Sequence, residues 1–239
     1  MALDVETILA PNPGPMTLEG TNTYLVGRDP VTVIDPGPAD EGHVEAVRAA
    51  AGERGGIGTV LITHSHEDHI GAVPLLGGEP AHPADGEVIA GLEALATPGH
   101  ISDHLCFLAR EERVLFSGDL ILGHGSTIVP PEEQDGSLAD YMDSLRRVGE
   151  LDLELILPGH GPPVEDPAAK IAEYIEHRES RERRLIAAIE GGETSRLALL
   201  RQVWDDVPPE LMPAAAYAMQ AHVEKLEHDG LLARGALTE

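Results

Sequence analysis

The stretch Thr63-His64-Ser65-His66-Glu67-Asp68-His69 places three histidines and two acidic residues within seven positions. It follows the run Gly58-Thr59-Val60-Leu61-Ile62, whose apolar and β-branched residues predict a buried strand. Alternate side chains of an extended segment point to the same side, so the first two histidines and the aspartate can face one way before the third histidine begins a helix. Imidazole nitrogens and carboxylate oxygens are the ligands that suit zinc and related divalent metals. The stretch therefore predicts a metal-binding loop at the end of a strand.

Three further turns each supply one more residue of the same chemical type. His100 follows Thr-Pro-Gly, Asp119 follows Ser-Gly and His160 follows Pro-Gly, each at or near the end of a strand-like run. Loops at strand ends carry function in layered folds. Together with the first stretch they make seven candidate ligands, which are His64, His66, Asp68, His69, His100, Asp119 and His160. Seven ligands are enough for two metal ions with an open position on each.

Composition limits the other classes of function. The chain has 239 residues, 42% of them hydrophobic and only 3% aromatic, so its core must be largely aliphatic. A formal net charge of −26 repels polyanions and disfavours nucleic acid as a partner, although a local basic patch stays open. The single Cys106 excludes an intramolecular disulfide and fits a reducing compartment. The first residues do not resemble a signal peptide, and no apolar run approaches a membrane span, so we expect a cytoplasmic protein without a membrane partner.

Strand-like and helix-like segments alternate along the first two thirds of the chain, which indicates a layered α/β fold. The predicted strands are 23–26, 31–34, 59–63, 105–108, 114–116 and 153–157. The predicted helices of this part are 41–51 and 137–148. Cys106 lies within one of these strands and is expected in the core.

The pattern changes after Pro167. A long amphipathic helix is predicted over 168–189, and two more follow at 195–207 and 213–229, before a turn and a short strand near 231–234. We therefore predict a catalytic domain over 1–166 and a small winged-helix-like element over 167–239. Their formal charges are −22 and −4, so the second is not a basic DNA-reading module. We expect it to pack or to form a homodimer through its helices.

The ordered motifs His-X-His-X-Asp-His, Gly-His, Gly-Asp and Gly-His resemble those of the metallo-β-lactamase superfamily. The runs 12–27, 116–123 and 140–145, with Pro-Gly-His-Gly-Pro at 158–162 and the winged-helix-like end, resemble the β-lactamase-like protein 2 family in particular. The metal ligands are similar to those of type II glyoxalases. This resemblance implies an αββα sandwich with the metals at one edge between two sheets.

The resemblance also assigns roles to residues. It implies one metal held by His64, His66 and His100, a second held by Asp68, His69 and His160, and Asp119 bridging the two. Asp35 matches an aspartate that supports the metal-binding loops without binding metal. His104 is expected to support His100 through the intervening turn. Two divalent ions, Zn²⁺ before Mn²⁺ or Fe²⁺, are the implied cofactors.

Two departures from the family pattern restrict the substrate. The span of about thirty residues between His69 and His100 is short, which indicates a reduced wall of the active-site cleft. Zinc β-lactamases of the common class carry a cysteine where Asp119 stands, so hydrolysis of antibiotics is not expected here.

The sequence thus predicts a dinuclear metal-dependent hydrolase in which Asp68 orients the nucleophile and accepts its proton. No serine or cysteine triad and no phosphate loop competes for the chemistry. We expect a small thioester, ester or lactone as substrate. The alternatives are a single-strand endoribonuclease, an iron-dependent sulfur oxygenase and a non-catalytic binding protein.

Further expectations concern residues outside the ligand set. His124, Ser126 and Thr127 lie in a loop after Asp119 and are candidates for contact with substrate. The only clustered arginines that RNA could use are those at 146, 147, 178, 181, 183 and 184. The histidines at 43, 82, 177, 222 and 228 are expected at the surface.

Overall fold

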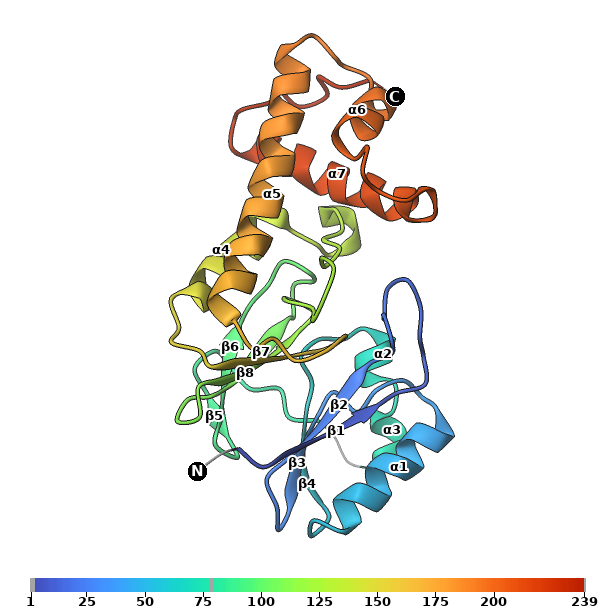
Figure 1. The fold of residues 1–239 in the computed structure, drawn as a ribbon, viewed down its shortest axis with the longest axis vertical. Coiled ribbons are helices and arrows are strands. Elements are labelled where there is room, and N and C mark those ends of the chain that lie inside the picture. Colours follow the sequence, from blue (N-terminus) through green and yellow to red (C-terminus); the bar gives the residue numbers. More distant parts are fainter. Residues whose placement is uncertain (1–2, 78–79, 239) are drawn as a thin grey trace. The chain divides into compact units, whose positions relative to one another are not determined.

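A computed structural model describes residues 3–77 and 80–238 of the chain (Figure 1). The described residues form two compact units. The first unit comprises Met1–Thr97, Asp103–Thr127 and Leu151–Ala168, and the second comprises Pro98–Ser102, Ile128–Glu150 and Ala169–Glu239. These units reflect packing, and the domain boundary between residues 166 and 167 stays a prediction.

Two sheets form the framework of the first unit. One contains β1 (Val5–Leu9), β2 (Asn22–Val26), β3 (Val31–Ile34) and β4 (Ile57–Leu61) in that order. Its first two pairings are antiparallel, and β3 and β4 are parallel. The other sheet contains β5 (Val88–Ile89), β6 (Leu92–Ala96), β7 (Leu105–Ala109), β8 (Val114–Gly118) and β9 (Leu155–Pro158). Only its last pairing, β8 with β9, is parallel.

A hydrophobic core joins the two sheets. Tyr24, Ile34 and Leu61 of the first sheet belong to the same buried cluster as Phe107 and Phe116 of the second. The rings of Tyr24 and Phe116 meet edge to face, with their centres 5.2 Å apart. Cys106 is fully buried in β7, which confirms its predicted place in the core.

Helices cover the outer face of the first sheet (Figure 1). They are α1 (Glu41–Gly52), α2 (Glu67–Ile70) and α3 (Val73–Leu76). The side chain of Asp40 accepts a hydrogen bond from the His43 amide and so caps the start of α1. Val47 of α1 and Val73 of α3 pack in one buried cluster with Val33 and Val60 of the sheet. The first unit thus contains a layer of helices and two layers of strands.

The two parallel strand pairs decide where the candidate ligands lie. The carboxyl ends of neighbouring parallel strands meet at one edge of a sheet, where ligands of α/β proteins are commonly bound. Asp35 follows β3 and Thr63 follows β4, while Asp119 follows β8 and His160 follows β9. The motifs at the ends of the predicted strands therefore come from equivalent places in the two sheets.

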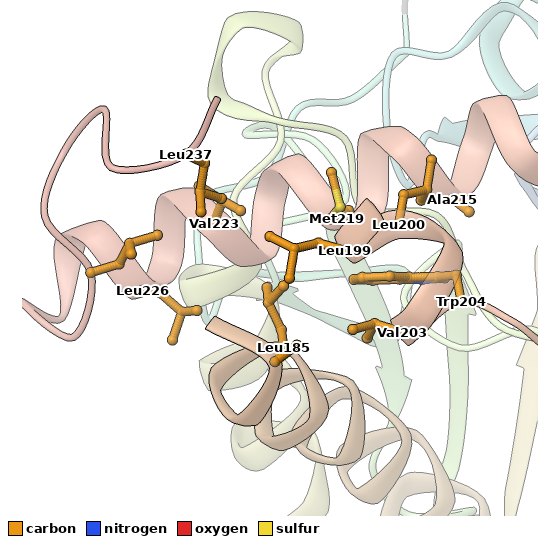
Figure 2. Packing of buried hydrophobic residues seen from close by; sticks show 12 residues of the cluster. Leu185, Leu199, Leu200, Val203, Trp204, Ala215, Met219, Val223, Leu226 and Leu237 are labelled. Carbon is orange, nitrogen blue, oxygen red and sulfur yellow. The ribbon is translucent and has the colours of Figure 1, made fainter. Parts of the chain in front are cut away.

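The second unit is helical. It contains α4 (Leu138–Gly149), α5 (Pro167–Glu190), α6 (Arg196–Val203) and α7 (Met212–His228), with short 3₁₀ turns η1 (Glu132–Gln134) and η2 (Pro209–Leu211). The first two residues of α5 belong to the first unit and the rest of the helix to the second. Figure 2 shows side chains of α5, α6 and α7 turned toward one another, including Leu185, Leu199 and Val223. The helix predicted over 195–207 ends at Val203, because the backbone of Trp204 has left the helical region with φ −111° and ψ 38°. Arg181 donates to the Val203 carbonyl at this end.

Three expectations from the sequence are wrong in the described chain. The short strand near 231–234 is absent; Gly230 and Gly235, which flank it, have positive φ, and the strand-like pairing nearby is an isolated bridge between Ser195 and Thr238. His43 and His222 are buried rather than at the surface.

Within the described residues, no helix combines the length and apolar character that crossing a membrane requires.

His222 gives the second unit a specific weakness toward acid. It is 1% exposed beside Trp204, with ring centres 5.7 Å apart, and both ring nitrogens lack a hydrogen-bond partner among the described residues. Burial, followed by neighbouring cations, holds the pKa of His222 well below its ordinary value. Those cations are Arg178, Lys225 and Arg181; His177 also lies near, but its own pKa is lowered to about 4, first by burial.

We predict that the second unit loses stability as the pH falls below about 6.5. There the unfolded chain takes up a proton at His222 that the folded chain refuses, which costs roughly 1 kcal/mol per pH unit. Replacing His222→Leu should reduce this slope, whereas His82→Leu, at an exposed position, should not. Urea unfolding followed by fluorescence of the single tryptophan measures both. Equal slopes in the unchanged chain and in His222→Leu would contradict the prediction.

Candidate metal centre

The ligand-rich stretch forms a turn between β4 and α2. His64, Ser65 and His66 lie before the helix, and the extended backbone of His66 precedes its first turn. The His69 amide donates to the His66 carbonyl at 2.9 Å, which closes that turn. The expected change from extended chain to helix therefore takes place within the motif and gives its histidines different directions.

Six of the seven candidate ligands belong to the first unit, which brings them together in two groups. His64, His66 and Asp119 offer ligand atoms within 4.8 Å of one another. The ligand atoms of Asp68, His69 and His160 also lie within 4.8 Å of one another. Asp119 Oδ1 is 3.5 Å from Nε2 of both His69 and His160, so this carboxylate lies beside both groups.

Hydrogen bonds on the outer nitrogens turn two imidazoles inward. Nδ1 of His69 is 2.8 Å from Asp35 Oδ2, and Nδ1 of His160 is 3.1 Å from the Gly20 carbonyl oxygen. Both partners accept, so each Nδ1 carries a proton and each neutral ring presents the lone pair of Nε2. These two Nε2 atoms face each other at 3.3 Å. Such an arrangement needs a shared proton or a cation, and the donor set fits a divalent metal.

Asp35 is the acceptor that connects the end of β4 with the ring of His69. Its carboxylate is 2% exposed and accepts from the Thr63 amide at 2.7 Å, from the Thr63 hydroxyl at 2.7 Å and from His69 at 2.8 Å. It thereby fixes the end of β4 and one metal-ligand ring at the same time. The role that the resemblance implied for Asp35, support of the metal-binding loops without binding metal, stays a prediction.

The electrostatics of the groups favour bound positive charge. Burial lowers the pKa of His160, but Asp119 and Asp68 outweigh it and raise that pKa to about 10. At His69 the burial effect is likewise outweighed, by Asp35 first, and the pKa is raised. Burial opposes ionisation of Asp119, yet the neighbouring His69 and His160 hold its pKa well below the usual range. Protons and metal ions would therefore compete for the same nitrogens.

Asp119 is held through its backbone. The Asp119 amide donates to Nε2 of His104 at 3.1 Å, and Nδ1 of that ring is 2.9 Å from the Thr97 hydroxyl. The Thr127 hydroxyl donates to the Asp119 carbonyl at 2.7 Å. His104 thus supports Asp119 directly, while its expected support of His100 stays a prediction. Thr127 is buried and positions the loop, and its contact with substrate also stays a prediction.

The remaining predicted residues lie in different settings. His100 belongs to the second unit, where its Nδ1 is 2.8 Å from the Ile128 carbonyl oxygen, and its role as a ligand stays a prediction. His124 is exposed and pairs with Glu19 at 3.0 Å, which ties two loops of the first unit together. Ser126 is exposed in the same loop.

Two features of the centre were not predicted from the sequence. Gly159 lies so close to the ligands that an added Cβ would be 2.6 Å from Asp119 Oδ1 and 2.8 Å from His69 Cε1. The Pro-Gly-His turn was a signal for a ligand, but the need for glycine follows only from the packing. The second feature is Thr21, whose hydroxyl is 3.3 Å from Asp68 Oδ2 and whose sequence neighbourhood contains no ligand.

We predict that Gly159→Ala weakens metal binding by roughly tenfold to a hundredfold, because the new methyl group must displace Asp119 or His69. Gly52→Ala is the matched control, since no atom lies within 4 Å of its added Cβ. Competition with a chromogenic chelator measures the affinity of each variant. Wild-type affinity in Gly159→Ala would show that the centre does not require this close approach.

Comparison with known proteins agrees with this geometry. Residues 16–86 and 80–160 match the model of the Metallo-beta-lactamase superfamily, and residues 195–237 match that of the Beta-lactamase associated winged helix domain. A Beta-lactamase-like protein 2 homolog of Caenorhabditis elegans is 36% identical, over 95% of this chain and 85% of the relative. The Atrochrysone carboxyl ACP thioesterase of Aspergillus fumigatus is 36% identical, over 78% of this chain and 65% of the relative.

Solved structures show the same fold. A metallo-beta-lactamase family protein from Thermus thermophilus has a TM-score of 0.80 and 23% identity, over 97% of this chain and 95% of that one. TTHA1623, solved in a di-iron-bound form, has a TM-score of 0.54 and 26% identity, over 72% of this chain and 97% of that one. These likenesses confirm the predicted αββα fold class with its winged-helix-like appendage. The chain belongs to the metallo-beta-lactamase superfamily.

Proposed function

We propose that the chain is a hydrolase that uses two divalent metal ions to cleave a small acyl substrate such as a thioester, an ester or a lactone. The observation that carries this proposal is that two ligand groups lie next to each other. Asp119 belongs to the first group, and its carboxylate is also close to His69 and His160 of the second. Two such groups fit a pair of ions better than one. His100 is proposed as a further ligand of the first group.

Asp68 is the residue of the centre that is best placed to act on substrate and water. Its side chain is 27% exposed, whereas His69 and His160 are almost fully buried. A carboxylate that reaches solvent can orient a water molecule and accept its proton. Divalent ions bound beside it would supply Lewis acidity, which polarises a carbonyl and acidifies water. Asp68 then holds the proton that the attacking water releases, and can return it to the leaving group.

Zinc is the proposed metal because imidazole nitrogens and carboxylate oxygens, which make up the ligand set, are ligands that zinc accepts in catalytic sites. The same donors also accept iron or manganese, and the related TTHA1623 has been solved in a di-iron-bound form. His124 and Ser126 are proposed to contact the substrate, because both are exposed in the loop that follows Asp119.

Charge favours a small substrate over RNA. An endoribonuclease needs cations to neutralise phosphates, but four of the six clustered arginines are already paired with acidic residues. Arg146 pairs with Asp143, Arg181 with Asp206, Arg183 with Glu176, and Arg184 with Asp205. Arg178 is 4% exposed and lies over the ring of Tyr141. A small acyl substrate needs no row of cations to bind it, and one relative is named as a thioesterase.

The other expectations about the protein's surroundings keep their status. A homodimer through the C-terminal helices, a cytoplasmic location and the absence of a nucleic-acid or membrane partner stay predictions. The oxygenase and the non-catalytic alternatives gain no support from the described residues, since six convergent ligands argue for a working pair of sites.

We predict that Asp68→Asn lowers kcat by about a hundredfold or more with a smaller change in KM, because the amide retains a ligand oxygen but accepts a proton poorly. Glu67→Gln removes the same charge from the exposed neighbouring residue and serves as the control. Steady-state kinetics with metal content measured on the same samples separates the two effects. Near-normal turnover of Asp68→Asn with both ions bound would show that Asp68 takes no part in proton transfer.

The proposed substrate class predicts weak dependence on salt. Cleavage of a small thioester or ester should change only mildly with ionic strength, because few charges are screened. The double change of Arg183→Gln and Arg184→Gln should leave that rate unaltered. A panel of thioesters, lactones and short single-stranded RNA at matched enzyme concentration makes the comparison. RNA cleavage that exceeds every acyl rate, and collapses as salt rises, would overturn the choice in favour of the endoribonuclease.

A further inference from the structure

The segment Gly20-Thr21-Asn22, at the start of β2, lies directly against the second ligand group. Thr21 forms an isolated β-bridge with His160, and the Asn22 amide donates to the Gly159 carbonyl at 2.8 Å. The Gly20 carbonyl accepts from Nδ1 of His160 at 3.1 Å. One short segment thus holds the ring of His160 and the turn before it.

The Thr21 side chain reaches a second member of the same group. Its hydroxyl is 3.3 Å from Asp68 Oδ2, and Thr21 is fully buried, so water does not compete for the contact. Oδ2 is also the oxygen that lies 3.3 Å from His160 Nε2 and 3.5 Å from His69 Nε2. A hydrogen bond to Oδ2 therefore fixes the oxygen of Asp68 that faces the ligand group.

Asn12 determines the direction of this hydrogen bond. The Thr21 amide can only donate, so the Asn12 oxygen must be the atom that faces it at 2.9 Å. The amide nitrogen of Asn12 then faces the Thr21 hydroxyl, also at 2.9 Å, and donates to it. Because the hydroxyl oxygen accepts from Asn12, its own single proton is left for Asp68.

The backbone keeps this segment in place. Gly20 has φ +138°, and an added Cβ would be 2.1 Å from the Ala10 carbonyl oxygen. The Thr21 carbonyl accepts from the Ala10 amide at 2.8 Å. The segment therefore approaches the end of β1 more closely than any residue with a side chain would allow, and Thr21 has little freedom to turn away from Asp68.

We propose that Thr21, oriented by Asn12, is a positioning residue that holds Asp68 in its working orientation. This inference rests on the proposed hydrolase function, but it makes a claim about metal binding that is measured without substrate.

The test compares Thr21→Val, which keeps the shape and removes the hydroxyl, with Thr21→Ser, which keeps the hydroxyl. Co²⁺ titration followed by absorbance, with chelator competition, gives the affinity for each of two ions. Thr21→Val should weaken the more weakly held ion about tenfold, and Thr21→Ser should restore it. Thr32→Val, at a buried threonine of β3, is the matched control and should bind both ions unchanged. Thermal unfolding without added metal verifies that all variants fold.

A double-mutant cycle tests the part played by Asn12. Asn12→Ala should weaken the same ion by a smaller factor. Its effect added to Thr21→Val should be smaller than its effect alone, because the contact with the hydroxyl is already lost and only the contact with the Thr21 amide remains to be removed. In the catalysed reaction Thr21→Val should lower kcat more than it changes KM. If the unchanged chain cleaved none of the acyl substrates, the proposed function would be refuted. The metal titration would still decide whether Thr21 positions Asp68.

Three results would overturn the inference. Thr21→Val could bind both ions as tightly as the unchanged chain, or Thr21→Ser could bind them as weakly as Thr21→Val. An unchanged chain that takes up no second ion would also overturn it, and would remove the dinuclear part of the proposed function as well.

Discussion

Lone pairs that face one another in a buried space are the constraint on which the centre depends. The Nε2 atoms of His69 and His160 lie 3.3 Å apart, and the carboxylates of Asp68 and Asp119 approach within 3.5 Å of them. Neither nitrogen can turn away, because each ring donates its other N–H to a fixed acceptor. Only positive charge relieves such an arrangement. The pKa of each histidine is raised despite burial because carboxylates lie beside it, Asp35 first at His69 and Asp119 first at His160. A pair of divalent ions meets the same need and adds Lewis acidity.

The fold supplies that constraint through its parallel strands. β3 and β4 deliver Asp35 and Thr63 at one sheet edge, and β8 and β9 deliver Asp119 and His160 at the other. Hydrogen bonds then cross between the sheets: the Asn22 side chain donates to the Pro158 carbonyl at 3.0 Å, and the Tyr24 hydroxyl donates to the same carbonyl at 2.7 Å. The ligands thus follow strands of two sheets, and hydrogen bonds join these sheets close to the ligands. These bonds limit how far the two ligand groups can move apart.

Much of the candidate centre could be predicted because each candidate ligand belongs to a short motif that is recognisable in the sequence. His64 to His69 follow a β-branched strand, and a glycine precedes His100, Asp119 and His160, so each motif is visible within a few residues. Predictions based on periodicity were also correct for long helices such as α5, whose bounds differ from the expected 168–189 by one residue at each end.

Features that depend on distant parts of the chain could not be predicted. β6 has the sequence Leu-Glu-Ala-Leu-Ala, which consists of good helix formers and becomes a strand only because β5 and β7 pair with it. β1 reads Val-Glu-Thr-Ile-Leu and is an edge strand, so its burial pattern is weak. His222 was expected at the surface because nothing in its own helix reveals the packing of Trp204 against it. The contact of Thr21 with Asp68 joins residues 47 positions apart, and it has no local signal at either end.

The central claim is that the two ligand groups hold two ions at once. Crystals grown with zinc, with diffraction data recorded on both sides of the zinc absorption edge, test it most directly. Two anomalous peaks are predicted, one among His64, His66 and Asp119 and the other among Asp68, His69 and His160. A single peak in a fully loaded crystal, or peaks away from both groups, would contradict it.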